Sequence, residues 1–266
     1  MRGMPSATAL LLTLSIIIAS PALAETPFEA ADRLIEAGHI PEARRALAAE
    51  LRMHPEHVEA RYNLAVLLQQ IDKQQEAAEL YRANLAIAWH LPSVINLVAL
   101  LQKQGYTDQA RQWLQKSTKQ LRSEAAPWYL LAAMAEGEGR TGDARQHYRK
   151  AVTTDPINGF AHLRLAAFQS RHKLADKGLK EANRAMQLLP DCAPCWRKSG
   201  DILLAADLHQ QALKAYQSAL AIKPDITTRQ QLIHLLERLG EHQRATRMQQ
   251  ALDVWKKHYP PESGPH

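Results

Sequence analysis

A small residue recurs about every 34 positions along this chain, and this period limits the possible folds more than any other feature. The recurring positions are Ala43, Ala77, Ala110, Ala144, Gly178, Ala212 and Ala245, with gaps of 34, 33, 34, 34, 34 and 33 residues. Four positions after most of them stands a bulky residue, namely Leu47, Tyr81, Leu114, Tyr148 or Tyr216, whereas Ala182 is small. Such a period predicts repeated structural units that bury their apolar faces by stacking on one another.

The pattern predicts that each repeat consists of two helices joined by a tight turn. Apolar residues recur at steps of three and four in 61–71 (RYNLAVLLQQI) and 128–136 (WYLLAAMAE), which is helical spacing. Four glycines are expected to end first helices in the left-handed conformation: Gly38, Gly105, Gly139 and Gly240. Prolines close four of the units, at Pro55, Pro156, Pro190 and Pro224.

These motifs resemble the tetratricopeptide repeat. One unit carries the signature residues Trp128, Ala144, Tyr148, Ala151 and Pro156, and another carries Trp196, Gly200, Ala212, Tyr216, Ala219 and Pro224. The resemblance covers roughly residues 27–258 and implies an all-α fold, a right-handed α-solenoid of about six to seven helix pairs. Two units depart from the pattern, with Trp89 and Arg122 where the closing proline is expected.

The first residues have the composition of a signal peptide. Arg2 precedes an apolar run from about Ala9 to Ile18, and Ala22 and Ala24 form the small-x-small pattern that signal peptidase recognises. We therefore expect a signal peptide at 1–24, cleaved after Ala24, a repeat domain at 25–260 and a disordered tail at 261–266. The apolar run is too short to span a bilayer. The expected location is the periplasm, with no membrane span in the mature chain.

Charge gives little indication of a nucleic-acid partner. The formal net charge is +6, but acidic and basic residues alternate along the helices, as in EARRALAAELR and DARQHYRK. This alternation is typical of solvated helix faces, whereas nucleic-acid binding calls for a concentrated basic stripe. We expect a protein or peptide partner and no nucleic acid.

The resemblance also implies where a partner binds, because the first helices of such repeats line a concave groove that holds peptides. Carried onto this sequence, the groove residues are Tyr62, Asn63, Asn96, Tyr129, Arg164, Arg197 and Lys198. Asn63 and Asn96 occupy equivalent positions, where an amide can both donate to and accept from a ligand backbone. The basic residues are candidates for binding a carboxylate. The same asparagines also suit a hydrogen bond to a neighbouring helix, and a few exposed arginines occur on any helix.

No constellation for catalysis is present in the sequence. It contains no nucleophile elbow, no glycine-rich phosphate loop and no HExxH, and its twelve histidines are dispersed. We expect no enzyme activity, no cofactor and no metal.

The only two cysteines, Cys192 and Cys195, lie in DCAPCW at the expected start of a first helix. Pro194 suits the first helical turn, and Asp191 suits a cap. Haem attachment would need a histidine where Trp196 stands, and zinc would need two more ligands. A disulfide staple, a redox pair of the thioredoxin type and free thiols remain open.

The sequence therefore predicts a non-catalytic periplasmic scaffold or chaperone-like adaptor that binds a protein or peptide segment. Similar periplasmic proteins act in assembly of envelope complexes and in cytochrome c maturation. The alternative from another class is a thiol-disulfide oxidoreductase or redox sensor that uses Cys192 and Cys195.

Overall fold

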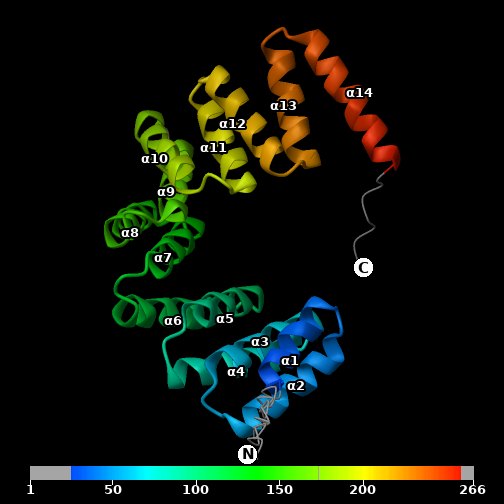
Figure 1. The fold of residues 1–266 in the computed structure, drawn as a ribbon. Coiled ribbons are helices and arrows are strands. Elements are labelled where there is room, and N and C mark those ends of the chain that lie inside the picture. Colours follow the sequence, from blue (N-terminus) through cyan, green and yellow to red (C-terminus); the bar gives the residue numbers. More distant parts are fainter. Residues whose placement is uncertain (1–24, 173, 259–266) are drawn as a thin grey trace, which may run out of the picture. The chain divides into compact units, whose positions relative to one another are not determined.

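The computed structural model describes residues 25–172 and 174–258, and all the regular structure within them is α-helical. Its fourteen helices follow one another in chain order from blue to red in Figure 1. The predicted all-α fold of six or seven helix pairs is confirmed, with seven pairs in the described residues. The predicted signal peptide at 1–24 and tail at 261–266 lie outside the described residues.

The chain divides into two compact units between Lys73 and Gln74. The first contains α1 (Pro27–Glu36), α2 (Ile40–Met53) and α3 (Val58–Gln70). The second contains α4 (Gln74–Ile87), α5 (Leu91–Lys103), α6 (Thr107–Gln120), α7 (Ala126–Gly137), α8 (Thr141–Thr154), α9 (Gly159–Arg171), α10 (Ala175–Leu188), α11 (Ala193–Ala205), α12 (His209–Ile222), α13 (Ile226–Arg238) and α14 (His242–His258). None of the described helices is long and apolar enough to cross a bilayer.

In the described residues, six of the turns between the two helices of a repeat pass through a left-handed residue at one register position. Gly38, Gly105, Gly139 and Gly240 have φ of 75°, 81°, 75° and 74°, as predicted. Asp72 and Asp207 take the same role with φ of 60° and 57°. The two aspartates were not predicted, although a short polar side chain tolerates this conformation better than most residues do.

The buried core lies between neighbouring helices of the repeats. Ala43, Ala77, Ala110, Ala144 and Ala212 have no exposed surface, and the bulky residues four positions later are at most 2% exposed. Gly200 of α11 shows why the small residues are needed, since a Cβ there would lie 2.6 Å from Cε1 of Tyr216 on α12. Tyr216 therefore fills space that any side chain at position 200 would occupy.

A second contact ties the start of a first helix to the proline that closes the preceding unit. The residue six positions after the proline donates its side-chain N–H to the proline carbonyl. The three pairs are Arg61 with Pro55, His162 with Pro156 (Nε2 to O 3.0 Å) and Trp196 with Pro190 (Nε1 to O 2.8 Å). Each bond satisfies a carbonyl at the junction between units.

Substituting Gly200 by alanine is expected to lower the free energy of unfolding by about 1–3 kcal/mol, because the added methyl group overlaps the Tyr216 ring. The control is Gly142→Ala in α8, where a Cβ would meet nothing within 4 Å. That change should stabilise the protein by up to about 1 kcal/mol. Chemical denaturation followed by circular dichroism measures both, and equal stability of the two variants would contradict this account of the core.

Candidate functional site

The predicted groove residues, which we call the predicted binding face, all lie on first helices. Tyr62 and Asn63 are on α3 of the first unit, and the other five are on α5, α7, α9 and α11 of the second. In repeat register, Asn63, Asn96, Arg164 and Lys198 occupy one position, and Gln231 of α13 occupies it again. One polar position therefore recurs along the first helices.

Both predicted asparagines bond to neighbouring helices. Asn63 donates from Nδ2 to Oδ1 of Asp32 on α1 at 3.4 Å, and Asn96 donates from Nδ2 to the Tyr81 hydroxyl of α4 at 3.1 Å. The helix-to-helix alternative stated for these residues is thus the contact that the structure shows. Ligand binding by the two asparagines stays a prediction.

The two tyrosines of the predicted binding face are partly buried. Tyr129 of α7 packs against Ala132, Tyr148 and Phe168. Burial raises the pKa of Tyr129, and the positive charge of Arg164 on α9 opposes that rise. The positive charge of Arg164 therefore acts on the Tyr129 hydroxyl across two neighbouring first helices.

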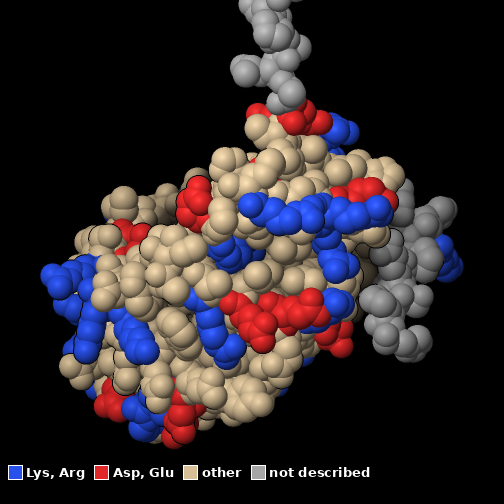
Figure 2. All heavy atoms as spheres, turned by 90° about the horizontal axis from the view of Figure 1, so that it is seen from below, with Lys and Arg blue, Asp and Glu red and all other residues tan. Residues whose placement is uncertain are grey.

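Two carboxylates that were not predicted, Glu136 and Asp201, pair with basic side chains of the first helices. Arg171 donates from Nε and Nη2 to the two oxygens of Glu136, both at 2.9 Å. Burial raises the pKa of Glu136. The hydrogen bond and the positive charge of Arg171 lower it by more, so the pKa lies below its ordinary value. Nζ of Lys198 lies 3.7 Å from Oδ2 of Asp201. Acidic and basic side chains also alternate over the surface in Figure 2.

Arg164 differs from these cations. It is exposed on α9 and forms no ion pair or hydrogen bond with a residue of the described ranges. Arg197 is half-buried, and its charge acts on Tyr216. Of the basic residues predicted for the site, Arg164 is the one that is both exposed and without an ion pair among the described residues.

A hydrogen bond to an aspartate of the preceding repeat occurs at two positions equivalent to Arg164, and Arg164 has no such aspartate. Asn63 bonds Asp32, and Gln231 bonds Asp201 from Nε2 to Oδ1 at 2.9 Å. In both cases the acceptor stands at the same register position of the preceding helix-pair repeat. The equivalent residue for Arg164 is Ala133 of α7, which is exposed and has no carboxylate. The register would have revealed this pattern in the sequence.

Shallow grooves accompany both of the amide–carboxylate contacts. One, of about 340 Å³ in the first unit, lies between α1 and α3 and is lined by Asp32, Ile35, Glu36, Asn63, Val66, Leu67 and Gln70. The other, of about 320 Å³ in the second unit, is lined by Asp201, Leu204, Ala205, Tyr216, Gln231, His234 and Arg238. Each is lined by apolar and polar side chains together, as ligand sites commonly are.

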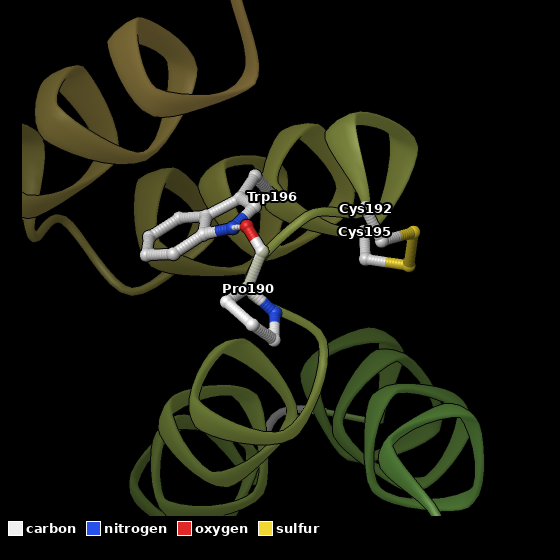
Figure 3. Close-up of a disulfide and its surroundings, with 4 residues drawn as sticks. All are labelled: Pro190, Cys192, Cys195 and Trp196. Atoms are coloured by element: carbon white, nitrogen blue, oxygen red, sulfur yellow. Dashed lines mark hydrogen bonds between the residues drawn. A yellow bond between two sulfur atoms is a disulfide. The ribbon is translucent and has the colours of Figure 1, made fainter. Parts of the chain in front are cut away.

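The cysteine pair stands at the start of α11 (Figure 3). Cys192 and Cys195 form a disulfide with sulfur atoms 1.99 Å apart and Cα atoms 5.2 Å apart. Cys195 is 3% exposed and packs with Leu163, Ala166 and Ile202. Cys192 is the N-cap residue and no side chain caps the helix, so the predicted capping by Asp191 is wrong. The role of the bridge as a staple stays a prediction.

A metal centre is not indicated in the part of the chain that the structure describes. Within it, no group of three His, Cys, Asp or Glu side chains is placed to hold an ion.

Known proteins share the repeat of this chain. Models of the tetratricopeptide repeat match residues 28–92 and 125–158. The crystal structure of the APC/C hetero-tetramer Cut9-Hcn1 is similar with a TM-score of 0.59 and 18% identity over 80% of this chain and 42% of that chain. MamA 41-end from Desulfovibrio magneticus RS-1 has a TM-score of 0.53 and 17% identity over 69% of this chain and 97% of that one. These two likenesses concern the fold.

A curated relative matches a smaller part. Protein O-mannosyl-transferase TMTC1 of Homo sapiens is 26% identical over 135 residues, which are 51% of this chain and 15% of that protein. The chain thus spans less than a sixth of that relative and less than half of the Cut9-Hcn1 chain.

Reducing the disulfide is expected to lower the free energy of unfolding by about 2 kcal/mol, the chain-entropy value for so short a loop. The helix content should not change, because the bridge spans one helical turn. Denaturation with and without dithiothreitol, followed by circular dichroism, measures the difference. The Cys192→Ser/Cys195→Ser variant is the control and should not respond to the reductant. Equal stability of the oxidised and reduced protein would exclude a staple.

Tyr148 is expected to make the protein sensitive to alkali. Its hydroxyl donates to Oε2 of Glu136 at 3.1 Å, and burial, followed by the charge of Glu136, raises the pKa of Tyr148 from 10.0 to about 12. The neutral phenol is favoured in the fold, so its stabilisation is complete below pH 10 and is lost as the pH rises to about 12. The loss should be about 2 kcal/mol.

The measurement is urea denaturation at pH 9 and at pH 11.5, for the wild type and Tyr148→Phe. The phenylalanine variant should lose less stability between the two pH values. An identical loss in both proteins would show that the Tyr148 hydroxyl does not titrate in this way.

Proposed function

Because this chain is a tetratricopeptide-repeat protein, we propose that it is a non-catalytic scaffold that holds a protein or peptide segment on the predicted binding face. Repeated helix pairs offer an extended surface rather than an enclosed pocket, which suits an extended ligand. The grooves beside Asn63 and Gln231 support this proposal, since each combines apolar and polar lining residues.

The observation that carries the proposal is the unpaired charge of Arg164. At the positions equivalent to Arg164, Asn63 and Gln231 each meet an aspartate of the preceding unit, whereas Arg164 is matched by Ala133. The described residues therefore supply no carboxylate at this place. We assign Arg164 to a carboxylate of the partner, either at its C-terminus or in an acidic segment, with the Tyr129 hydroxyl nearby.

The cysteine pair serves the scaffold in this proposal. The sulfur of Cys195 belongs to the core formed with Ala166, Ala182 and Ile202, which leaves Cys192 as the more exposed sulfur. A thiol-disulfide oxidoreductase needs an accessible sulfur in a site that holds a second disulfide or dithiol. Cys192 meets the first of these requirements, so a thiol-disulfide oxidoreductase stays the alternative, whereas the burial of Cys195 supports a role of the bridge in holding the start of α11.

The proposed place of action is the periplasm, on the signal-peptide pattern of residues 1–24. A disulfide between Cys192 and Cys195 fits an oxidising compartment. Capture of a partner there would suit assembly of envelope complexes or cytochrome c maturation, and a nucleic acid is not the expected partner.

The test is photo-crosslinking in the producing cells, with a photoreactive amino acid in place of Ala133, an exposed residue of α7. We expect one partner protein to be captured, and mass spectrometry of the crosslink should locate an acidic or C-terminal segment. Arg164→Gln should weaken the binding of that segment about tenfold, because a charge-assisted hydrogen bond is lost.

The matched control is Arg145→Gln, which removes an exposed arginine from α8 and should leave binding unchanged. Equal capture by the Arg164→Gln variant would contradict the assignment of Arg164. A photoreactive amino acid at position 145 is the matched crosslinking control, and crosslinks that form from position 145 but never from position 133 would contradict the predicted binding face as a whole.

A further inference from the structure

A cavity of about 450 Å³ lies on a part of the second unit that the proposed function does not use. It is lined by Trp128 at the start of α7 and by Gln146, His147, Arg149, Lys150 and Thr153 along α8. None of these residues belongs to the predicted binding face, so this inference goes beyond the proposed function. The cavity combines one large aromatic wall with a row of polar and basic groups.

The charge of the cavity is positive. Its lining contains no carboxylate, and Arg149 and Lys150 are exposed and have no ion pair among the described residues. Lys150 Nζ lies 5.9 Å from the centroid of the Trp128 ring, so the ammonium group stands over the aromatic face. An anion that enters the cavity therefore meets cationic groups next to an apolar surface.

The indole of Trp128 has an unused donor. Trp196 stands at the same register position and donates from Nε1 to the carbonyl of Pro190 at 2.8 Å. Six residues before Trp128 the chain has Arg122 instead of proline, and no described residue accepts from the Trp128 indole. The departure from the repeat pattern thus leaves an indole N–H at the cavity wall without its usual acceptor.

His147 adds a second unsatisfied group. Its Nδ1 is buried and has no hydrogen-bond partner, and its ring centroid lies 5.7 Å from that of Trp128. Burial lowers the pKa of His147, so the ring is neutral at pH 7 and presents one donor and one acceptor nitrogen. A buried polar atom without a partner is destabilising, and a bound ligand can remove that cost.

From this cavity we infer a binding site for an aromatic carboxylate, whose ring packs on Trp128 and whose carboxylate pairs with Lys150 and Arg149. The aromatic ring of the ligand would pack on the accessible part of the Trp128 indole. The carboxylate would accept hydrogen bonds from the cationic side chains and from the indole N–H. Two sources offer this chemistry, a free aromatic acid and the C-terminal aromatic residue of a polypeptide.

The chain contains its own control for this site. One unit earlier, Lys116 of α6 stands at the register position of Lys150, with Nζ 5.2 Å from the Trp113 ring. Trp89 packs on Trp113 with ring centroids 6.2 Å apart. The lysine is thus repeated there, but Trp113 stands at the register position of His147, and Trp89 packs on Trp113 as Trp128 packs on His147. Lys116 is therefore a matched lysine over an aromatic ring that does not line the cavity beside Trp128.

The experiment follows the indole N–H signals of the five tryptophans in the ¹⁵N-labelled protein by two-dimensional NMR. The probes are 3-phenylpropionate, the tripeptide Gly-Gly-Phe with a free carboxylate, and the same tripeptide with an amidated C-terminus. The signal that disappears in Trp128→Phe identifies Trp128. We expect this signal to shift with at least one of the two acids, with a Kd on the order of 1 mM, and not to shift with the amide.

Lys150→Gln should weaken binding of the acid about tenfold, whereas Lys116→Gln should change it by less than about twofold. Circular dichroism of both variants verifies that the helices are intact. Binding of 3-phenylpropionate alone would identify a free acid as the source, and binding of the free tripeptide would identify a polypeptide C-terminus. A Trp128 signal that neither acid moves, equal binding of the amide, or full binding by Lys150→Gln would overturn the inference.

Discussion

The close contact between a small residue and a bulky one, which recurs in most of the helix pairs, is the constraint on which the other features depend. Gly200 and Tyr216 show it most directly, because no Cβ fits between the helix backbone and the ring. The contact fixes the distance between the two helices, and the tight turn with a left-handed residue fixes their direction. Once both are set, the remaining apolar stripe of a pair can be buried only against a neighbouring pair.

Much of this architecture could be predicted from the sequence, because packing repeats with the chain. The buried alanines, the glycine turns and the number of helix pairs all follow from one register. The aspartate turns at Asp72 and Asp207 escaped prediction, since a rule based on glycine ignores other residues that tolerate positive φ. The candidate site was less predictable, because the contacts of Asn63 and Arg164 depend on a residue of the preceding unit. Reading each position against its neighbour one unit earlier would have paired Asn63 with Asp32.

Charge on the first helices is largely balanced within the chain, and this limits what the surface can recognise. Glu136 holds Arg171 through two hydrogen bonds, and Asp201 accepts from Tyr216 and Gln231. Such groups are already satisfied, so a ligand gains little by competing for them. We propose that recognition is concentrated where such internal partners are missing among the described residues, at Arg164 on α9 and beside Trp128 at the start of α7. Before Arg164 the chain has Ala133 where two other repeats have Asp32 and Asp201, and before Trp128 it has Arg122 where four repeats have proline.

The bonds from Arg61, His162 and Trp196 to the prolines that precede them have a consequence for how such chains diverge. Three side chains with different shapes and charges reach the same kind of backbone acceptor from the same place. What this position retains is a nitrogen donor at a suitable distance, whatever residue carries it. Substitution matrices score these exchanges as unrelated, although the junction keeps the same hydrogen bond. Distant members of such a lineage would therefore be recognised better by aligning donors and acceptors than by aligning amino-acid identities.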